Sequence, residues 1–153
     1  MEDVWQYPRP PALQPVSLPV RIEFAGRVVA QTEGAFRVLE TSHPPVYYLP
    51  PEAFTGCVLE PASGRSLCEW KGVARYWSLR VGERVAVRAA WSYPDPAEPF
   101  VAIAEYLAVY AGMMDACFVG DEQVTPQPGG FYGGWITRDL QGPFKGVPGS
   151  AGW

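Results

Sequence analysis

Residues 68–77 read CEWKGVARYW, and residues 90–94 read AWSYP. These two runs place three tryptophans, two tyrosines, a thiol and one of the chain's two lysines within a short length of sequence. Tyrosine and tryptophan have polar tips that need partners, so they suit the wall of a pocket better than a closed core. We therefore expect the fold to be organised around a hairpin that carries a binding surface.

The expected hairpin has its turn at Gly82. Pairing residues whose numbers add up to 163 places Trp70 opposite Tyr93 and Tyr76 opposite Val87. Residues two apart in a strand share a face, and a slip of one residue would reverse every assignment. In this register one surface carries Trp70, Ala74, Tyr76, Trp91 and Tyr93.

Working outward, apolar alternation and turn residues predict further strands. They cover residues 20–24, 27–31, 36–40, 46–49, 54–59, 65–70 and 115–119. The last hairpin before the central one would turn at 60–64, which reads EPASG, and would place Cys57 opposite Cys68. Such a pair is either two buried thiols or a redox-active or metal-sharing pair. The pattern of residues 97–107 predicts one short helix. Over residues 105–112, helix and strand remain alternatives.

Composition divides the chain into three parts. Residues 1–19 contain five prolines, which favour an extended N-terminal arm. Residues 20–124 form the expected β domain. Residues 125–153 hold half of the sixteen glycines, interleaved with aromatic residues. Flexible linkers do not normally contain aromatics, so we expect this tail to lie on the body or on a second subunit, as in a homodimer.

Charge and cysteine content exclude several function classes. The net charge is −4 and the basic residues are scattered, so we expect no nucleic-acid partner. Three cysteines and one histidine do not suffice for a zinc site of four Cys and His ligands, and we expect no metal or other cofactor. The odd cysteine count favours a reducing cytoplasm, and the lack of a signal peptide or long apolar run predicts no membrane association.

Four motifs occur in a recognisable order: LET at 39–41, PVYYLP at 45–50, CEWKGVARYW at 68–77 and AWSYPDP at 90–96. Together they resemble the family known as domain of unknown function 427, over about residues 20–122. The resemblance implies a small, mainly β fold, with a tent-like or barrel-like pair of antiparallel sheets. The β-tent fold is shared by zinc-binding domains such as the thalidomide-binding domain of cereblon. Their CxxC pairs are absent here, so the resemblance does not carry over a metal site.

The same family has been labelled nucleotidyltransferase-like. This chain has neither a paired-aspartate metal motif nor a glycine-rich phosphate loop, so the sequence does not favour that activity. The arm and tail resemble extensions seen in cyanobacterial members.

Two sets of candidate site residues follow. The catalytic candidates are Lys71, Glu40 and Cys68. Lys71 could form a Schiff base or bind an anion, and Glu40 could act as an acid or base; the alternatives are an exposed lysine and a solvated strand-end carboxylate. Cys68 would need a nearby base to become a nucleophile. The ligand-binding candidates are Tyr47, Tyr48, Trp70, Lys71, Tyr76, Trp91 and Tyr93, some of which must face an ordinary aromatic core.

Three functions are compatible with these residues. The first is binding of a small molecule in an aromatic pocket, which is the main hypothesis. The second is an enzyme that uses Lys71, Glu40 or Cys68 in the same pocket. The third is a protein-interaction module that binds its partner through the arm and tail.

Overall fold

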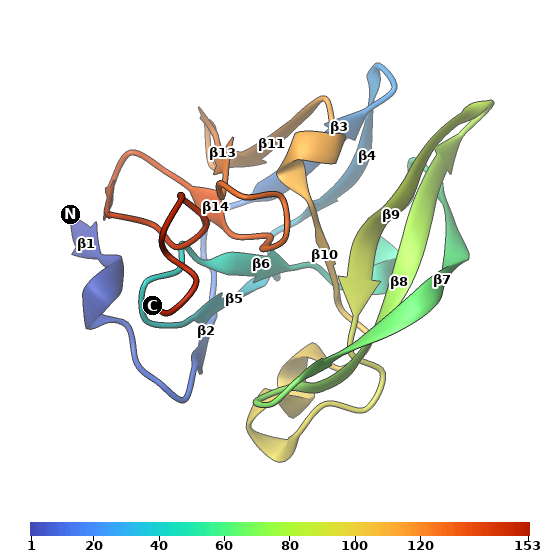
Figure 1. Ribbon diagram of the computed structural model, residues 1–153. Coiled ribbons are helices and arrows are strands. Elements are labelled where there is room, and N and C mark those ends of the chain that lie inside the picture. The colour runs from blue at the N-terminus through green and yellow to red at the C-terminus, as the bar shows by residue number, and fades with distance from the viewer.

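Three antiparallel sheets make up most of the fold in the computed structural model, which describes residues 1–153 (Figure 1). The largest has the order β10-β9-β8-β7, and contains β7 (Val58–Cys68), β8 (Gly72–Val81), β9 (Arg84–Ser92) and β10 (Leu107–Val109). The second has the order β12-β11-β3-β4, and contains β3 (Val20–Phe24), β4 (Arg27–Thr32), β11 (Ala116–Val119) and β12 (Glu122–Gln123). The third has the order β2-β5-β6, and contains β2 (Ala12–Pro15), β5 (Phe36–Leu39) and β6 (Val46–Tyr48). The expected mainly β fold is confirmed, and its sheets remain open rather than closing into a barrel.

Short elements complete the chain. Two strand pairs, β13 (Thr125–Pro126) with β14 (Trp135–Ile136) and β1 (Glu2–Asp3) with β15 (Leu140–Gln141), belong to the terminal segments. The helical elements are all 3-10 turns: η1 (Val4–Gln6), η2 (Pro51–Ala53), η3 (Glu98–Ile103) and η4 (Ala111–Met113). None of them is long or apolar enough to span a membrane.

The β3–β4 hairpin illustrates how local sequence determines structure. Val20, Ile22 and Phe24 alternate with polar residues and are buried, as the pattern predicts. The two-residue turn uses Ala25 and Gly26, both with positive φ, which is the geometry of tight hairpins and the reason a glycine stands there.

The hairpin predicted over residues 54–70 is wrong. β7 runs without a turn through residues 60–64, and the EPASG composition produces a bulge between Ala62 and Arg65. β7 is an edge strand, so it tolerates both Pro61 and the bulge without breaking a ladder on two sides. The true turn falls at residues 69–71, between β7 and β8, which places Trp70 and Lys71 in the turn rather than in a strand.

The predicted pairing of β8 with β9 is also wrong in register. Tyr76 lies opposite Trp91, not Val87. The pairing next to the turn, Val81 with Arg84, is already shifted by two residues, and the bulge between Trp77 and Leu79, where three residues of β9 face Ser78, adds two more. The difference from Val87 to Trp91 is four residues. An even shift keeps every side chain on its predicted face, so the expected aromatic surface survives the register error.

Residues 97–107 form no α-helix. The 3-10 element η3 ends at Ile103, and Glu105 has a φ of 68°, which terminates any helix. The alternatives over 105–112 resolve into the strand β10 followed by η4. Because β10 pairs with β9 and Leu107 bridges to Leu49, this segment joins the largest sheet to β6.

Two buried clusters fill the fold. The larger lies among the first two sheets and includes Ile22, Val29 and Leu79. The smaller contains Tyr48, Ala74, Trp91, Tyr93, Phe100 and Ile103, with Trp70 and Tyr76 packed against it. This second cluster is aromatic-rich and forms the base of the candidate site.

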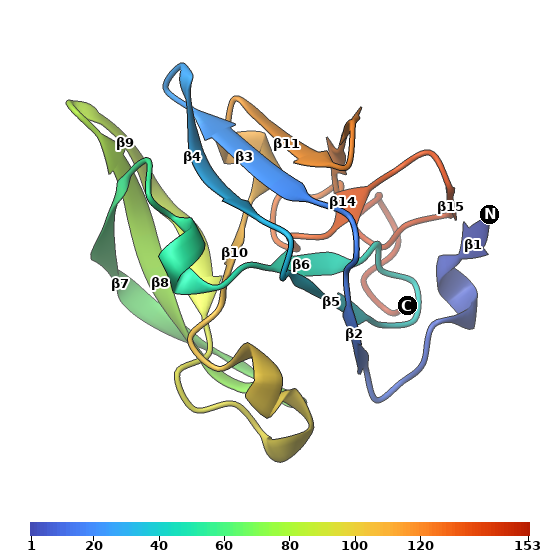
Figure 2. The same ribbon diagram turned by 180° about the vertical axis from the view of Figure 1, so that it is seen from behind.

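Both terminal segments pack on the body. Residues 12–15 of the expected arm form β2, an edge strand paired with β5. The tail contacts β6 through a Trp135 N–H to Pro45 carbonyl hydrogen bond of 2.8 Å. Trp5 and Trp153 rings meet edge to face at 5.2 Å, so the two ends of the chain lie on the same side of the molecule (Figures 1 and 2).

Candidate functional site

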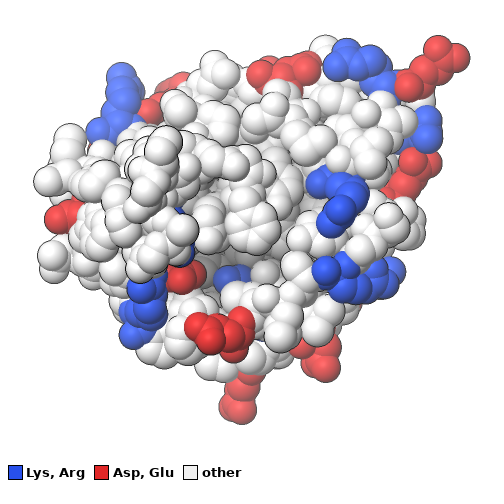
Figure 3. All heavy atoms as spheres, in the orientation of Figure 1, with Lys and Arg blue, Asp and Glu red and all other residues white.

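A cavity of about 410 Å³, here called the central cavity, lies beside the aromatic cluster. Eight of the nine predicted site residues line it: Glu40, Tyr48, Cys68, Trp70, Lys71, Tyr76, Trp91 and Tyr93. They come from β5–β9 and the adjoining turns, so the fold gathers residues that are 53 positions apart (40 to 93) in the sequence. Figure 3 shows this face hollowed near its middle, with mostly uncharged atoms around the hollow.

The cavity walls are formed by aromatic rings. Tyr48, Trp91 and Tyr93 are buried, and the Tyr48 and Tyr93 ring centroids lie 6.4 Å apart. Tyr110 adds a ring 4.6 Å from Trp91. Burial raises the pKa of the Tyr48 and Tyr93 phenols well above the ordinary value, so both remain neutral hydroxyls. These buried rings therefore form a packed, uncharged wall, and the rings of Trp70, Tyr76 and Tyr110 are the half-buried ones along the cavity.

Lys71 is the most unusual residue of the cavity. Its turn is held by a 3.0 Å hydrogen bond from the Ala97 N–H to the Lys71 carbonyl. The side chain is only 8% exposed, yet it forms no ion pair, and Lys145 is the only lysine whose ammonium donates a hydrogen bond. Lys71 Nζ lies 5.7 and 5.9 Å from the centres of the Tyr93 and Phe100 rings, within the range of cation–π contacts. A buried cation without an anionic partner is costly, and it is available to a ligand.

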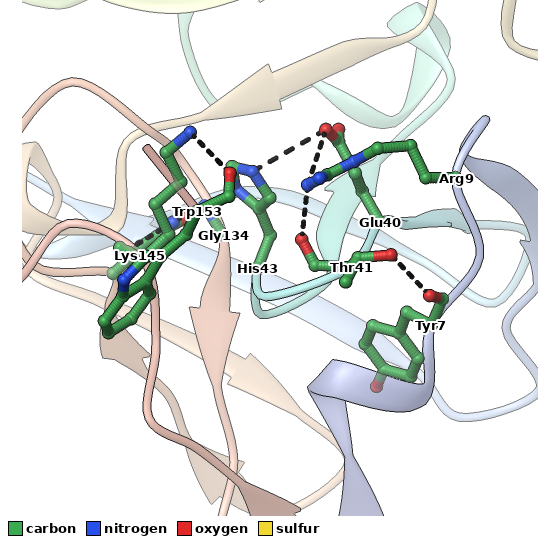
Figure 4. Close-up of polar contacts among 9 residues, drawn as sticks. Tyr7, Arg9, Glu40, Thr41, His43, Gly134, Lys145 and Trp153 are labelled. Atoms are coloured by element: carbon green, nitrogen blue, oxygen red, sulfur yellow. Dashed lines mark hydrogen bonds and ion pairs between the residues drawn. The ribbon is translucent and has the colours of Figure 1, made fainter. Parts of the chain in front are cut away.

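Glu40 is already engaged by the N-terminal segment. Its Oε2 lies 3.7 Å from the Arg9 guanidinium and 3.7 Å from His43 Nε2 (Figure 4). Arg9 is fixed by a 2.9 Å hydrogen bond to the Thr41 carbonyl. The carboxylate at this wall is therefore partly neutralised, while the Glu69 carboxylate lies exposed at the rim.

His43 was not predicted as a site residue, but it lines the central cavity. The ring is 8% exposed, and Nδ1 lies 3.3 Å from the Gln127 amide nitrogen. Burial, together with the charges of Lys145, Arg9 and Lys71, lowers the pKa of His43 to about 4. Glu40 would favour the imidazolium, but Arg9 shares the same carboxylate oxygen, so burial prevails and His43 is neutral at pH 7. The only feature of the sequence that distinguished His43 as a possible site residue is that the chain has no other histidine.

The tail closes one side of the central cavity. Phe131, Tyr132, Gly133 and Lys145 line it, and none was predicted. Lys145 Nζ donates to the Trp153 main-chain oxygen at 3.2 Å and lies 5.3 Å from the centre of the Tyr132 ring (Figure 4 shows the Lys145–Trp153 contact). The aromatic residues among the glycines predicted that the tail packs on a protein surface, but they did not predict that this surface is the wall of the central cavity.

Gly133 contacts the cavity wall so closely that no side chain fits. A Cβ there would lie 2.1 Å from Trp91 Cη2. Because Trp91 is itself buried, we expect Gly133→Ala to lower the free energy of unfolding by about 1–3 kcal/mol. Urea denaturation measures the change. The matched control is Gly152→Ala, where a Cβ meets nothing within 4 Å; equal stability of the two variants would contradict this packing.

The cysteines do not form a pair. Cys68 lies opposite Gly72, and Cys57 precedes β7, so the predicted placement of Cys57 opposite Cys68 is wrong. All three thiols are free. Both ring nitrogens of His43 approach other residues, Gln127 and Glu40, so the base that Cys68 would need is directed elsewhere. No group of three or more His, Cys, Asp or Glu side chains is arranged to hold a metal ion.

Tyr47 is the one predicted ligand-binding residue that does not line the central cavity. It alternates with Tyr48 along β6 and points to the other side, where it stacks on Trp135 at 5.1 Å. There it borders a smaller cavity of about 260 Å³ with Arg37.

Fold and site together define a small, mainly β domain with an aromatic-lined cavity and a buried lysine. The sequence model of the family described as domain of unknown function (DUF427) matches residues 12–120, and the chain belongs to this family. The cavity residues contributed by the tail lie outside the matched segment. No curated protein matches the chain.

Proposed function

We propose that this protein binds a small, flat molecule with an anionic group, and that the central cavity is the binding site. The observation that carries the proposal is Lys71, a residue only 8% exposed that lines the cavity and forms no ion pair. A carboxylate bound there would supply the missing partner in a site shielded from water.

The charges around Lys71 favour an anion over the cationic ligand that an aromatic cage also suits. Burial keeps His43 uncharged, and Arg9 offsets the carboxylate of Glu40. Of the charged residues that line the cavity, only Lys71 is buried, and it forms no ion pair. A cationic ligand would meet repulsion from Lys71.

The rings support a flat ligand. Trp70, Tyr76 and Tyr110 line the cavity and are half-buried, so they can offer π faces and edges. Stacked or edge-to-face contacts with a planar molecule add to the burial of apolar area. The volume of about 410 Å³ lies within the range of small-molecule sites. A single lysine is a point charge, which suits a carboxylate, whereas phosphate sites usually combine several cations or backbone N–H groups.

Two matched compounds test the proposal by isothermal titration calorimetry. Naphthalene-2-carboxylate and 2-naphthamide have the same ring and nearly the same size, but only the first is charged. We expect the carboxylate to bind about tenfold more tightly, because a charge-assisted hydrogen bond replaces a neutral one. Equal affinity of the two compounds, or binding of neither, would count against an anion site at Lys71.

We also propose a cytoplasmic location for the protein. All three cysteines are free thiols, and Cys57 and Cys68 are partly exposed. Exposed thiols persist in reducing compartments and tend to oxidise elsewhere.

A further inference from the structure

A second cavity of about 570 Å³, here called the outer cavity, adjoins the central one. The two share five lining residues: Tyr76, Tyr110, Phe131, Tyr132 and Gly133. Tyr110 Oη donates a 3.1 Å hydrogen bond to the Phe131 carbonyl, so the tail crosses the sheet where the cavities meet. The shared residues form the boundary between the two cavities, so the cavities are direct neighbours.

Arg88 lies at this junction and lines the outer cavity. The guanidinium carbon of Arg88 is 4.2 Å from the centre of the Tyr76 ring on β8. Its Nη2 would lie 3.1 Å from a Cβ added to Gly64 on β7. The Arg88 side chain therefore lies over both strands. The guanidinium forms no ion pair. Burial raises the pKa of Tyr110, and the charge of Arg88 opposes this rise only in part.

The backbone at Arg88 is strained to hold this position. Its φ is 55°, a region that residues with a side chain rarely adopt, and its N–H donates to Ser78 Oγ at 3.0 Å. The strain belongs to the same bulge that displaces the β8–β9 register. Strained residues of this kind concentrate at functional sites, where the surrounding structure compensates for them.

We infer that the ligand is elongated, extends past the shared aromatic boundary, and has a second anionic group that Arg88 binds in the outer cavity. This inference rests on the proposed function, because it assumes that Lys71 binds the first anionic group. The aromatic middle of such a dianion would pass between Tyr76, Tyr110 and Tyr132, which line both cavities. Arg88 is then the residue that distinguishes dicarboxylates from monocarboxylates.

Calorimetry with two pairs of probes of different length tests the inference. The pairs are naphthalene-2-carboxylate with naphthalene-2,6-dicarboxylate, and biphenyl-4-carboxylate with biphenyl-4,4′-dicarboxylate. In at least one pair we expect the dicarboxylate to bind the wild-type protein about four- to tenfold more tightly. This combines the roughly two- to fivefold range for an ion pair with an exposed arginine and the factor of about two that two equivalent carboxylates give by statistics. Arg88→Gln should reduce the preference to this statistical factor, and Arg88→Lys, which keeps the charge, should retain most of it.

Arg84→Gln is the matched control. Arg84 also lies on β9 and over an aromatic ring, that of Phe24 at 5.2 Å, but it lines neither cavity, so its removal should leave the preference intact. If monocarboxylates bind and the dicarboxylates exceed them by no more than the statistical factor of about two, the role of Arg88 is wrong while the proposed function stands. A preference above this factor that survives in Arg88→Gln overturns the role of Arg88 as well. If none of the four probes binds, both proposals fail.

Discussion

Replacing Lys71 by methionine is expected to weaken binding of naphthalene-2-carboxylate about tenfold and to raise the free energy of unfolding by about 1 kcal/mol. The loss of affinity follows from removing the one buried cation that can pair with the ligand's carboxylate. The gain in stability follows because methionine fills a similar volume without burying an unpaired charge. Opposite signs for binding and stability are typical of residues kept for function rather than for folding.

Calorimetry and urea denaturation measure the two effects on the same protein. Arg75→Gln provides the control, because Arg75 is a cation of the neighbouring strand that lies 5.3 Å from the Trp77 ring and does not line the central cavity. In Arg75→Gln, the affinity for naphthalene-2-carboxylate and the free energy of unfolding should both stay close to the wild-type values. A Lys71→Met variant that binds the carboxylate as well as the wild type refutes the anion site, and one that is less stable shows that Lys71 supports the fold instead.

Acidification from pH 7 to pH 4 is expected to cost the protein about 2–3 kcal/mol of stability through His43 alone. The folded-state pKa of about 4 lies below the ordinary value of 6.5, so protons bind preferentially to the unfolded chain. The contribution of His43 is therefore fully present above pH 6.5 and is lost progressively as the pH falls toward 4. Its physical cause is the burial of a ring that must stay neutral beside Lys145, Arg9 and Lys71.

The measurement compares the pH dependence of unfolding of the wild type with that of His43→Gln. Glutamine does not titrate, so the variant's free energy of unfolding should fall less between pH 7 and pH 4, whatever its stability at pH 7. Other groups also titrate in this range; Glu2, whose pKa its contacts with Arg37 and Tyr7 lower, loses stabilising interactions as the pH falls. Taking the difference between the two proteins cancels such contributions. Parallel curves would show that His43 is not buried in its neutral form.

Several features of the fold could be predicted because they depend on neighbouring residues. The tight turn at Ala25 and Gly26 and the strands around it follow from residue types that lie next to one another. The turn at 60–64 was predicted by the same reasoning and is wrong, because whether EPASG makes a turn or a bulge depends on β7 lying at the edge of a sheet. Whether β7 lies at the edge of its sheet depends on how strands distant in the sequence pair with one another, which the local sequence does not encode.

The candidate site also combines features that the sequence predicts with features that only the packing decides. Residue types and alternation were sufficient to place Trp91, Tyr93 and Tyr76 on one face, since that assignment depends only on the parity of the strand and survives a register shift of four. Alternation also separates Tyr47 from Tyr48, but it does not say which of the two faces the cavity. Only the packing of Tyr47 on Trp135 decides that.

The sequence therefore determined the mainly β class, the family and the aromatic face, all of which are encoded in short motifs and period-two patterns. Tertiary structure alone decided that Lys71 lies buried and unpaired, that His43 is neutral beside it, and that residues 131–133 close the central cavity. Burial, charge compensation and cavity shape depend on which segments distant in the sequence come into contact, and local sequence patterns do not encode those contacts.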